Sequence, residues 1–293
     1  MEQSLIGTSF SLATGVALAC YYTLNKKVAG AGNPLQIIFW IFVAHLPPLV
    51  VWAVLAWPLH MDFTYFLPGL GVLALTVTGN LLAIRALSLS PFSLMIPVMS
   101  LSPVFTSLIG IPLLQEWPTE TQWVGIVLAV AGVMWLYAPT ERPWDIFSFW
   151  KGFFRERGAP SMALSALAWS LSAPMDKLAL RHADPPFHAL FVFFGLVIFL
   201  LIWLTIRDEW KAAPIARSFW VLLALTGAAG ASADILQLFA LLHTHAGTFE
   251  AIKRVVSQVL ALIIGYFLFH EQMTRPRLIG IAIICVGVPM IVL

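Results

Sequence analysis

Long runs of apolar residues dominate the chain, and short polar segments separate them. No charged side chain occurs between Gln3 and Asn25, and only His45 and His60 are ionisable between Val28 and Met61. A helix needs about 20 apolar residues to cross a hydrocarbon core of ~30 Å. We therefore predict ten membrane-spanning windows: 4–24, 34–57, 65–85, 91–114, 121–138, 160–180, 186–206, 218–242, 246–269 and 276–293.

These windows are predicted to be helices, because lipid offers the backbone N–H and C=O groups no other partners. The alternation over about ten residues that is typical of an outer-membrane barrel is absent. The first window lacks the basic start and short apolar run of a signal peptide, since Glu2 is acidic, so we expect it to be retained.

Composition agrees with a membrane protein and excludes several other classes. Of the 293 residues, 60% are apolar and 10% charged, whereas soluble proteins average about 45–50% and about 25%. A net charge of +2 without a basic run excludes a nucleic-acid binder. The two cysteines, Cys20 and Cys285, lie in apolar windows and provide no disulfide framework.

Lysine and arginine residues concentrate on one side of the predicted membrane. The connections that follow odd-numbered windows hold twelve of the 16, and the other connections hold only Lys177 and Arg181. The remaining two, Lys253 and Arg254, lie inside a window. The positive-inside rule then predicts cytoplasmic odd connections, with both termini outside.

The chain repeats itself, which indicates a tandem duplication. At an offset of 155 residues Glu116 matches Glu271, at 154 Asn80 matches Asp234, and at 151 Asn25-Lys26 matches Asp176-Lys177. We predict five-helix units at 1–139 and 159–293, joined by an aromatic-rich linker, 140–158, that is either an interfacial helix or a loop. Because five is odd, the second unit enters the membrane from the opposite side, as in secondary transporters with inverted repeats.

Each half ends in the same pattern of residues, and this pattern resembles the EamA family of the drug/metabolite transporter superfamily. It comprises Pro103, Gly110, Glu116, Gly125 and Gly132, then Ser257, Gly265, Glu271, Gly280 and Gly287, with Ile252-Lys253-Arg254 ahead of the second set. The resemblance implies a carrier of amino acids, other small metabolites, sugar phosphates or nucleotide sugars. It further implies a central cavity lined by helices 1, 3, 4, 6, 8 and 9, and cytoplasmic termini, opposite to the charge count.

Four ionisable side chains are predicted near the bilayer centre, where each costs at least ~2.5–3.5 kcal/mol. Asp234 precedes the turn at Thr244 by ten residues, and Lys253 and Arg254 follow it by nine and ten. At a rise of 1.5 Å per residue these positions are about 15 Å deep on antiparallel neighbours, so the side chains can meet. Glu250 shares a helix face with Lys253 and Arg254, and Gln237, one turn from Asp234, can join them.

Two interpretations of these residues stay open. They could form a charge-balanced structural network, or Arg254 or Lys253 could hold a substrate anion while Asp234 or Glu250 binds its cation or a coupling proton. A guanidinium fork suits carboxylate or phosphate, which favours Arg254. The first-half counterparts Met95, Val98 and Met99 are apolar, so the site should suit an amphipathic solute. The candidate substrate-binding residues are Arg254, Lys253, Asp234, Glu250, Gln237, Asn80 and Trp169, the last as part of a cavity wall.

Other polar residues favour structural roles. We interpret His45 as a hydrogen-bonded structural residue, with proton carriage as the alternative. Lys26 and Lys177 are expected to snorkel to headgroups, although Asp176-Lys177 could form a gating salt bridge. Glu116 and Glu271 are expected to complement the dipole of the helix that follows each of them.

No enzyme motif is complete. His270-Glu271 lacks the second histidine of a zinc protease, and neither a Gly-x-Ser-x-Gly elbow nor a Walker motif occurs. We therefore predict a ten-helix secondary transporter that exports a small organic metabolite by alternating access, driven by protons or by the solute's own gradient. It is expected to be a monomer among the lipids of a bacterial inner membrane, without cofactor, metal or nucleic acid. The alternatives are a carrier or flippase for a phosphorylated or lipid-linked anion, and a non-transporting scaffold.

Overall fold

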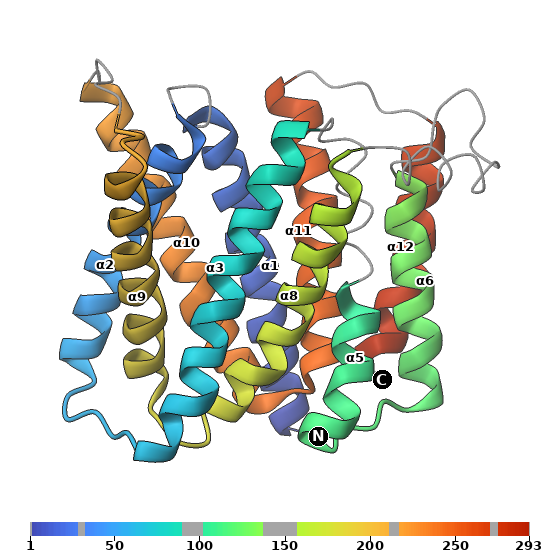
Figure 1. The fold of residues 1–293 in the computed structure, drawn as a ribbon. Helices are drawn as coiled ribbons and strands as arrows, with labels where there is room; N and C mark the ends of the chain where they lie inside the picture. Colours follow the sequence, from blue (N-terminus) through green and yellow to red (C-terminus); the bar gives the residue numbers. More distant parts are fainter. Residues whose placement is uncertain are drawn as a thin grey trace.

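The computed structural model describes residues 2–28, 33–89, 102–136, 157–210, 217–269 and 275–292. Within these ranges the chain forms ten α-helices and one short 3-10 turn (Figure 1). The elements are α1 (Glu2–Val28), α2 (Pro34–Leu55), η2 (Phe63–Tyr65), α3 (Phe66–Leu89), α5 (Ser102–Leu114), α6 (Glu120–Leu136), α8 (Ala159–Ala179), α9 (Pro185–Ile206), α10 (Arg217–His243), α11 (Ala246–Phe269) and α12 (Arg275–Val292). The all-helical fold predicted from the apolar windows is confirmed.

Helix starts follow local sequence signals. The Asn33 side chain accepts a hydrogen bond from the Leu35 backbone N–H at 3.1 Å, and Pro34 occupies the first position of α2. Proline suits this position because its missing N–H would have no partner within the helix. Asp184 and Pro185 begin α9 in the same residue order, at the matching place in the repeat. The second helix of each half therefore begins at the same kind of local sequence signal.

Several helices are long and apolar enough to cross a membrane. Among the described residues five satisfy both criteria: Leu5–Asn25, Pro34–Leu55, Phe63–Ala86, Pro185–Ile206 and Phe219–His243. The 13-residue α5 is apolar but shorter, since positions 91–101 of its predicted window lie outside the described residues. Glu250, Lys253 and Arg254 interrupt the apolar character of α11.

The two halves pack against each other with two-fold symmetry. Helix α1 packs on α10 and α11, and its counterpart α8 packs on α3 and α5. The pairs α2–α9, α5–α11 and α6–α12 each join matching helices. In Figure 1 α1 and α8 run in opposite directions, and both chain ends lie at the same end of the bundle. The inverted repeat predicted from the sequence is therefore present in three dimensions.

Glycines of the repeated pattern allow α6 and α12 to approach closely. A Cβ atom added to Gly125 would lie 2.8 Å from the Gly287 carbonyl oxygen, and one added to Gly132 would lie 2.9 Å from that of Gly280. These contacts are reciprocal, because a Cβ on Gly287 would lie 3.0 Å from the Gly125 carbonyl oxygen. The glycines therefore serve packing between the halves.

The proposed unit limits at 139 and 159 and the side of the membrane that holds the termini stay predictions. Most of the linker, together with Glu271, lies outside the described residues.

Candidate functional site

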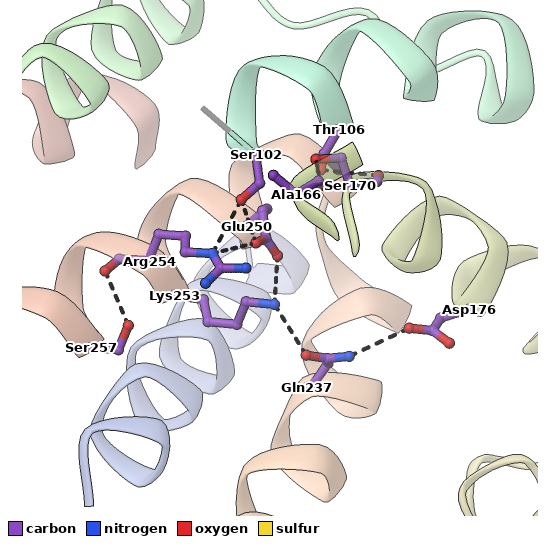
Figure 2. A network of polar contacts seen from close by, with 10 residues as sticks. All are labelled: Ser102, Thr106, Ala166, Ser170, Asp176, Gln237, Glu250, Lys253, Arg254 and Ser257. Carbon is purple, nitrogen blue, oxygen red and sulfur yellow. Dashed lines mark hydrogen bonds and ion pairs between the residues drawn. The ribbon is translucent and has the colours of Figure 1, made fainter. Parts of the chain in front are cut away.

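Glu250 lies at the centre of a buried charge cluster on α11 (Figure 2). Its Oε1 accepts a hydrogen bond from Arg254 Nε at 2.8 Å, and its Oε2 lies 2.5 Å from Lys253 Nζ. The i,i+3 and i,i+4 spacings place all three side chains on one face of the helix. The Glu250 side chain is only 1% exposed, so both cations compensate a carboxylate that has almost no access to water. The predicted pairing within α11 agrees with this geometry.

A serine of the first half joins this cluster from α5. Ser102 Oγ donates to Glu250 Oε1 at 2.9 Å and accepts from Arg254 Nε at 3.1 Å. Its counterpart in the repeat, Ser257, donates to the Arg254 carbonyl oxygen at 3.1 Å. The cluster is therefore built by both halves of the chain, at the seam between α5 and α11.

Gln237 on α10 extends the cluster toward α8. Lys253 Nζ donates to Gln237 Oε1 at 3.2 Å, and Gln237 Nε2 donates to Asp176 Oδ2 at 3.4 Å. With a cation at its oxygen and a carboxylate at its nitrogen, the amide has one favourable orientation. Sequence reasoning expected Gln237 to join the charges, and it bridges Lys253 to Asp176.

Asp234 does not contact the cations of α11, although its predicted depth in the membrane matches theirs. The sequence predicted that it would meet Lys253 or Arg254, but its Oδ2 lies 3.8 Å from His45 Nε2 on α2. The Asp234 side chain is 26% exposed, in contrast to that of Glu250. Helical rise predicts depth but not rotation about the axis, and the rotation directs Asp234 toward α2. The site therefore has two separate carboxylates with different surroundings.

His45 is buried and belongs to the surroundings of Asp234. Its Nδ1 lies 2.8 Å from the Ile41 carbonyl oxygen, and its ring contacts the aromatic rings of Tyr21, Phe42 and Phe193. These contacts agree with the structural interpretation of His45.

Trp169 lies on the seam between α3 and α8, and Asn80 belongs to α3. The Asn80 side-chain amide donates to the Thr76 carbonyl oxygen at 2.8 Å within its own helix. Trp169 packs against Gly79, where an added Cβ would lie 2.6 Å from the indole Nε1. Neither residue contributes to the hydrogen bonds drawn around Glu250 (Figure 2). Their role in substrate binding stays a prediction.

Glu116 follows the end of α5, Lys177 lies in the last turn of α8, and the two side chains form an ion pair. Lys177 also donates to the Thr244 carbonyl oxygen at 2.6 Å, and Glu116 Oε2 accepts from the Ala246 backbone N–H at 2.8 Å. Two expectations were therefore wrong. Lys177 is paired instead of snorkelling, and Glu116 caps α11 of the other half instead of the helix that follows it.

A buried triad was missed by the sequence analysis. His188 on α9 lies between Asp176 and Tyr65, with Nε2 3.0 Å from Asp176 Oδ1 and Nδ1 2.8 Å from the Tyr65 hydroxyl. An ionisable residue inside an apolar window was a visible signal for His188, but its partners come from distant segments. In the part of the chain that the structure describes, no group of three or more His, Cys, Asp or Glu side chains could hold a metal ion.

Comparison with known proteins identifies the family. The sequence profile of the EamA-like transporter family matches residues 5–138 and again residues 156–293. No curated protein matches the chain. A protein of known crystal structure has a similar fold, with a TM-score of 0.79 over 99% of this chain and 98% of that chain; at 16% identity the similarity shows the fold alone. The chain therefore belongs to the EamA-like transporter family and is a multi-pass membrane transporter.

Proposed function

We propose that the chain carries a zwitterionic small organic solute, such as an amino acid, by alternating access. Arg254 and Lys253 hold the solute carboxylate, and Asp234 holds its ammonium group. The protein acts as a carrier and not as an enzyme, as a monomer in a bacterial inner membrane. The sequence predicts export, and transport assays in vesicles test this direction separately.

The contrast between the two carboxylates carries this proposal. Glu250 is saturated by Ser102, Lys253 and Arg254, so it serves to hold the cations in place. Asp234 is partly exposed, and its nearest basic group, His45 Nε2, is beyond hydrogen-bonding distance. Asp234 is therefore the carboxylate better suited to receive a cation from a solute.

Arg254 supports binding of the anionic end. Its hydrogen bonds to Glu250 and Ser102 both leave from Nε. A guanidinium held at Nε presents its terminal N–H groups in the fork geometry that matches a carboxylate.

The test is a thermal-shift screen of the purified protein against L-amino acids, amines, nucleosides and sugar phosphates. A ligand at 100 times its Kd stabilises the folded state by about 2.7 kcal/mol. We expect amino acids to stabilise the wild type and to lose this effect in both Arg254→Gln and Asp234→Asn. Asp208→Asn is the matched control, because Asp208 is exposed and has a φ of 51°, which asparagine also tolerates.

A phosphorylated anion is the second candidate, favoured by the adjacent cations Lys253 and Arg254. In that case only sugar phosphates would stabilise the protein, and the effect would be lost in Arg254→Gln but kept in Asp234→Asn. This result would identify a phosphorylated anion, and not a zwitterion, as the substrate.

A further inference from the structure

We propose that the Asp176–His188 pair binds the proton that couples transport to a proton gradient. The identity of the transported solute rests on the proposed function. Asp176 and His188, in contrast, are not among the residues proposed to bind that solute. The pair lies in the second half, between α8 and α9.

Five side chains form a continuous chain of contacts from one end of the bundle to the charge cluster. Tyr65 contacts His188, His188 contacts Asp176, Asp176 accepts from Gln237, and Gln237 accepts from Lys253. Tyr65, His188 and Asp176 are all buried. Figure 2 shows the inner part of this chain, with Gln237 between Asp176 and Lys253. The geometry thus connects a protonatable pair to a cation of the predicted solute site.

The hydrogen bonds assign the resting tautomer of His188. An ionised Asp176 accepts, so Nε2 carries the hydrogen, and Nδ1 accepts from the Tyr65 hydroxyl. Protonation then occurs at Nδ1: Tyr65 gives its hydroxyl proton to Nδ1 and receives one from the aqueous side. The imidazole becomes an imidazolium, the hydroxyl is restored, and no other bond changes.

The outer end of this path lies close to exposed polar residues. Asp62, directly before η2, lies 3.9 Å from His182 Nδ1, and the Thr64 hydroxyl lies 3.0 Å from the same nitrogen. The Tyr65 backbone N–H donates to the Asp62 carbonyl oxygen. The Tyr65 backbone therefore lies next to exposed polar residues, while the Tyr65 side chain is buried.

Gln237 transmits the charge of the pair, because an amide does not readily relay a proton. While Asp176 is an uncompensated carboxylate, it attracts Gln237 Nε2, and Gln237 Oε1 then holds Lys253. An imidazolium at His188 neutralises Asp176 and weakens that attraction. Lys253 is then freer to bind a solute carboxylate. Proton binding and carboxylate binding therefore favour each other, and by linkage the effect is reciprocal.

The charge count supports the same coupling. With His188 neutral, the carboxylates of Asp176, Glu250 and Asp234 outnumber the cations of Lys253 and Arg254 by one. One added proton cancels this excess, and a zwitterion, whose own charges sum to zero, leaves the loaded site neutral. Proton and solute consequently move in the same direction, so an inward proton gradient drives uptake. Export would then depend on the solute's own gradient.

The repeat shows that the fold itself does not require this pair. At the offset of 151 residues, Asp176 corresponds to Asn25 and His188 to Ile37. The first half therefore builds the same helix pair without a protonatable group at either position. An acid and an imidazole at only one of two equivalent places indicate a function that only one side of the membrane needs.

Other ionisable groups around the pair are few in the described segments. Tyr65 faces it from η2 and Lys253 from α11 through Gln237, while α10 contributes Asp234, whose charge interacts with Asp176. Helix α2 places His45 against Phe193 of α9. Helix α5 has no ionisable residue, and Arg85 is the only one of α3. Of these groups, Lys253 and Asp234 also belong to the proposed solute site, and they link the two sites.

The test uses proteoliposomes and an equimolar mixture of radiolabelled L-amino acids as the probe. Counterflow at equal pH measures solute exchange, and uptake driven by a pH gradient measures coupling. A gradient of one pH unit supports up to about tenfold accumulation if one proton accompanies each solute. We expect Asp176→Asn and His188→Gln to keep counterflow and to lose accumulation, and Tyr65→Phe to accumulate more slowly. The exposed His245, in the turn between α10 and α11, supplies the control His245→Gln.

Accumulation by Asp176→Asn and His188→Gln at the wild-type level would overturn the proton site. Absence of counterflow in every protein, wild type included, would contradict the zwitterionic cargo instead. A measurement without solute then decides the proton site: nitrogen-15 NMR of labelled histidine across a pH titration. We expect the His188 signal to change protonation state in the folded wild type and to shift its titration in Asp176→Asn. A His188 signal that does not respond to pH while the protein stays folded would refute the proposal.

Discussion

At the scale of single residues, Glu250 shows how a carboxylate is retained in an apolar helix. A buried charge is tolerated when it is paired and hydrogen-bonded. Ser102, Lys253 and Arg254 supply those partners. Removing one partner of a buried ion pair is costly because the remaining charge stays without compensation.

Neutralising Glu250 should therefore destabilise the protein. Glu250→Gln leaves two buried cations without their shared carboxylate, and we expect a loss of about 3–5 kcal/mol in the free energy of unfolding. Thermal or denaturant unfolding in detergent measures this loss. Glu120→Gln, at an exposed position of α6, is the control and should change stability by less than about 1 kcal/mol. Equal stability of the two variants would mean that Glu250 does not hold the cluster together.

At the scale of elements, the α6–α12 pair depends on glycine. Gly125 has the Gly287 carbonyl oxygen and Ile291 within 2.8 Å of the position that a Cβ would take. Real Cβ atoms do not come this close to backbone, so any larger residue requires the helices to separate.

Gly125→Ala should consequently weaken this helix pair. We expect a destabilisation of about 1–3 kcal/mol, the usual cost of overpacking a tight contact. Gly110→Ala is the matched control, since the nearest atom to its added Cβ is Glu116 Oε2 at 3.9 Å. Alanine should leave the protein unchanged or slightly more stable there, because it is the better helix former. Thermal unfolding of both variants measures the difference in their stability. Equal stability would mean that α6 and α12 can separate without cost.

At the scale of the whole molecule, one end of the bundle is tied across the two halves. The Asp62 backbone N–H donates to the His182 carbonyl oxygen at 2.8 Å, and that of Asp184 donates to His60 at 3.0 Å. Glu116 adds its contacts to Lys177 and to the start of α11. Alternating access requires these ties to break when this end opens.

Glu116→Gln should loosen the tied end. The amide keeps the size of the side chain but removes the charge that attracts Lys177 and the α11 N-terminus. We expect faster hydrogen exchange of the backbone amides at the start of α11, measured by mass spectrometry. Exchange in α2 should not change, and Arg181→Gln, an exposed charge at the same end, is the control. Unaltered exchange at Ala246 would show that Glu116 does not fasten this end.

The fold was more predictable than the site. Apolar windows and the repeat are one-dimensional signals, and they gave the helices and their inverted arrangement. The Glu250, Lys253 and Arg254 contacts were also predictable, because they follow from spacing within one helix. The rotation of Asp234 toward His45, the Glu116 cap on α11 and the Tyr65–His188–Asp176 triad depend on how separate helices pack, which spacing along the chain does not encode.

The reciprocal packing of matching helices has a consequence for the origin of the protein. Helices α1 and α8 each lie against helices of the other half, so a five-helix unit alone would leave those surfaces uncovered. Two copies inserted head to tail in the same bilayer would cover them. The present chain has the contacts of such an antiparallel homodimer. We infer an ancestral five-helix protein that inserted in both orientations, and a later gene fusion that joined one copy in each orientation.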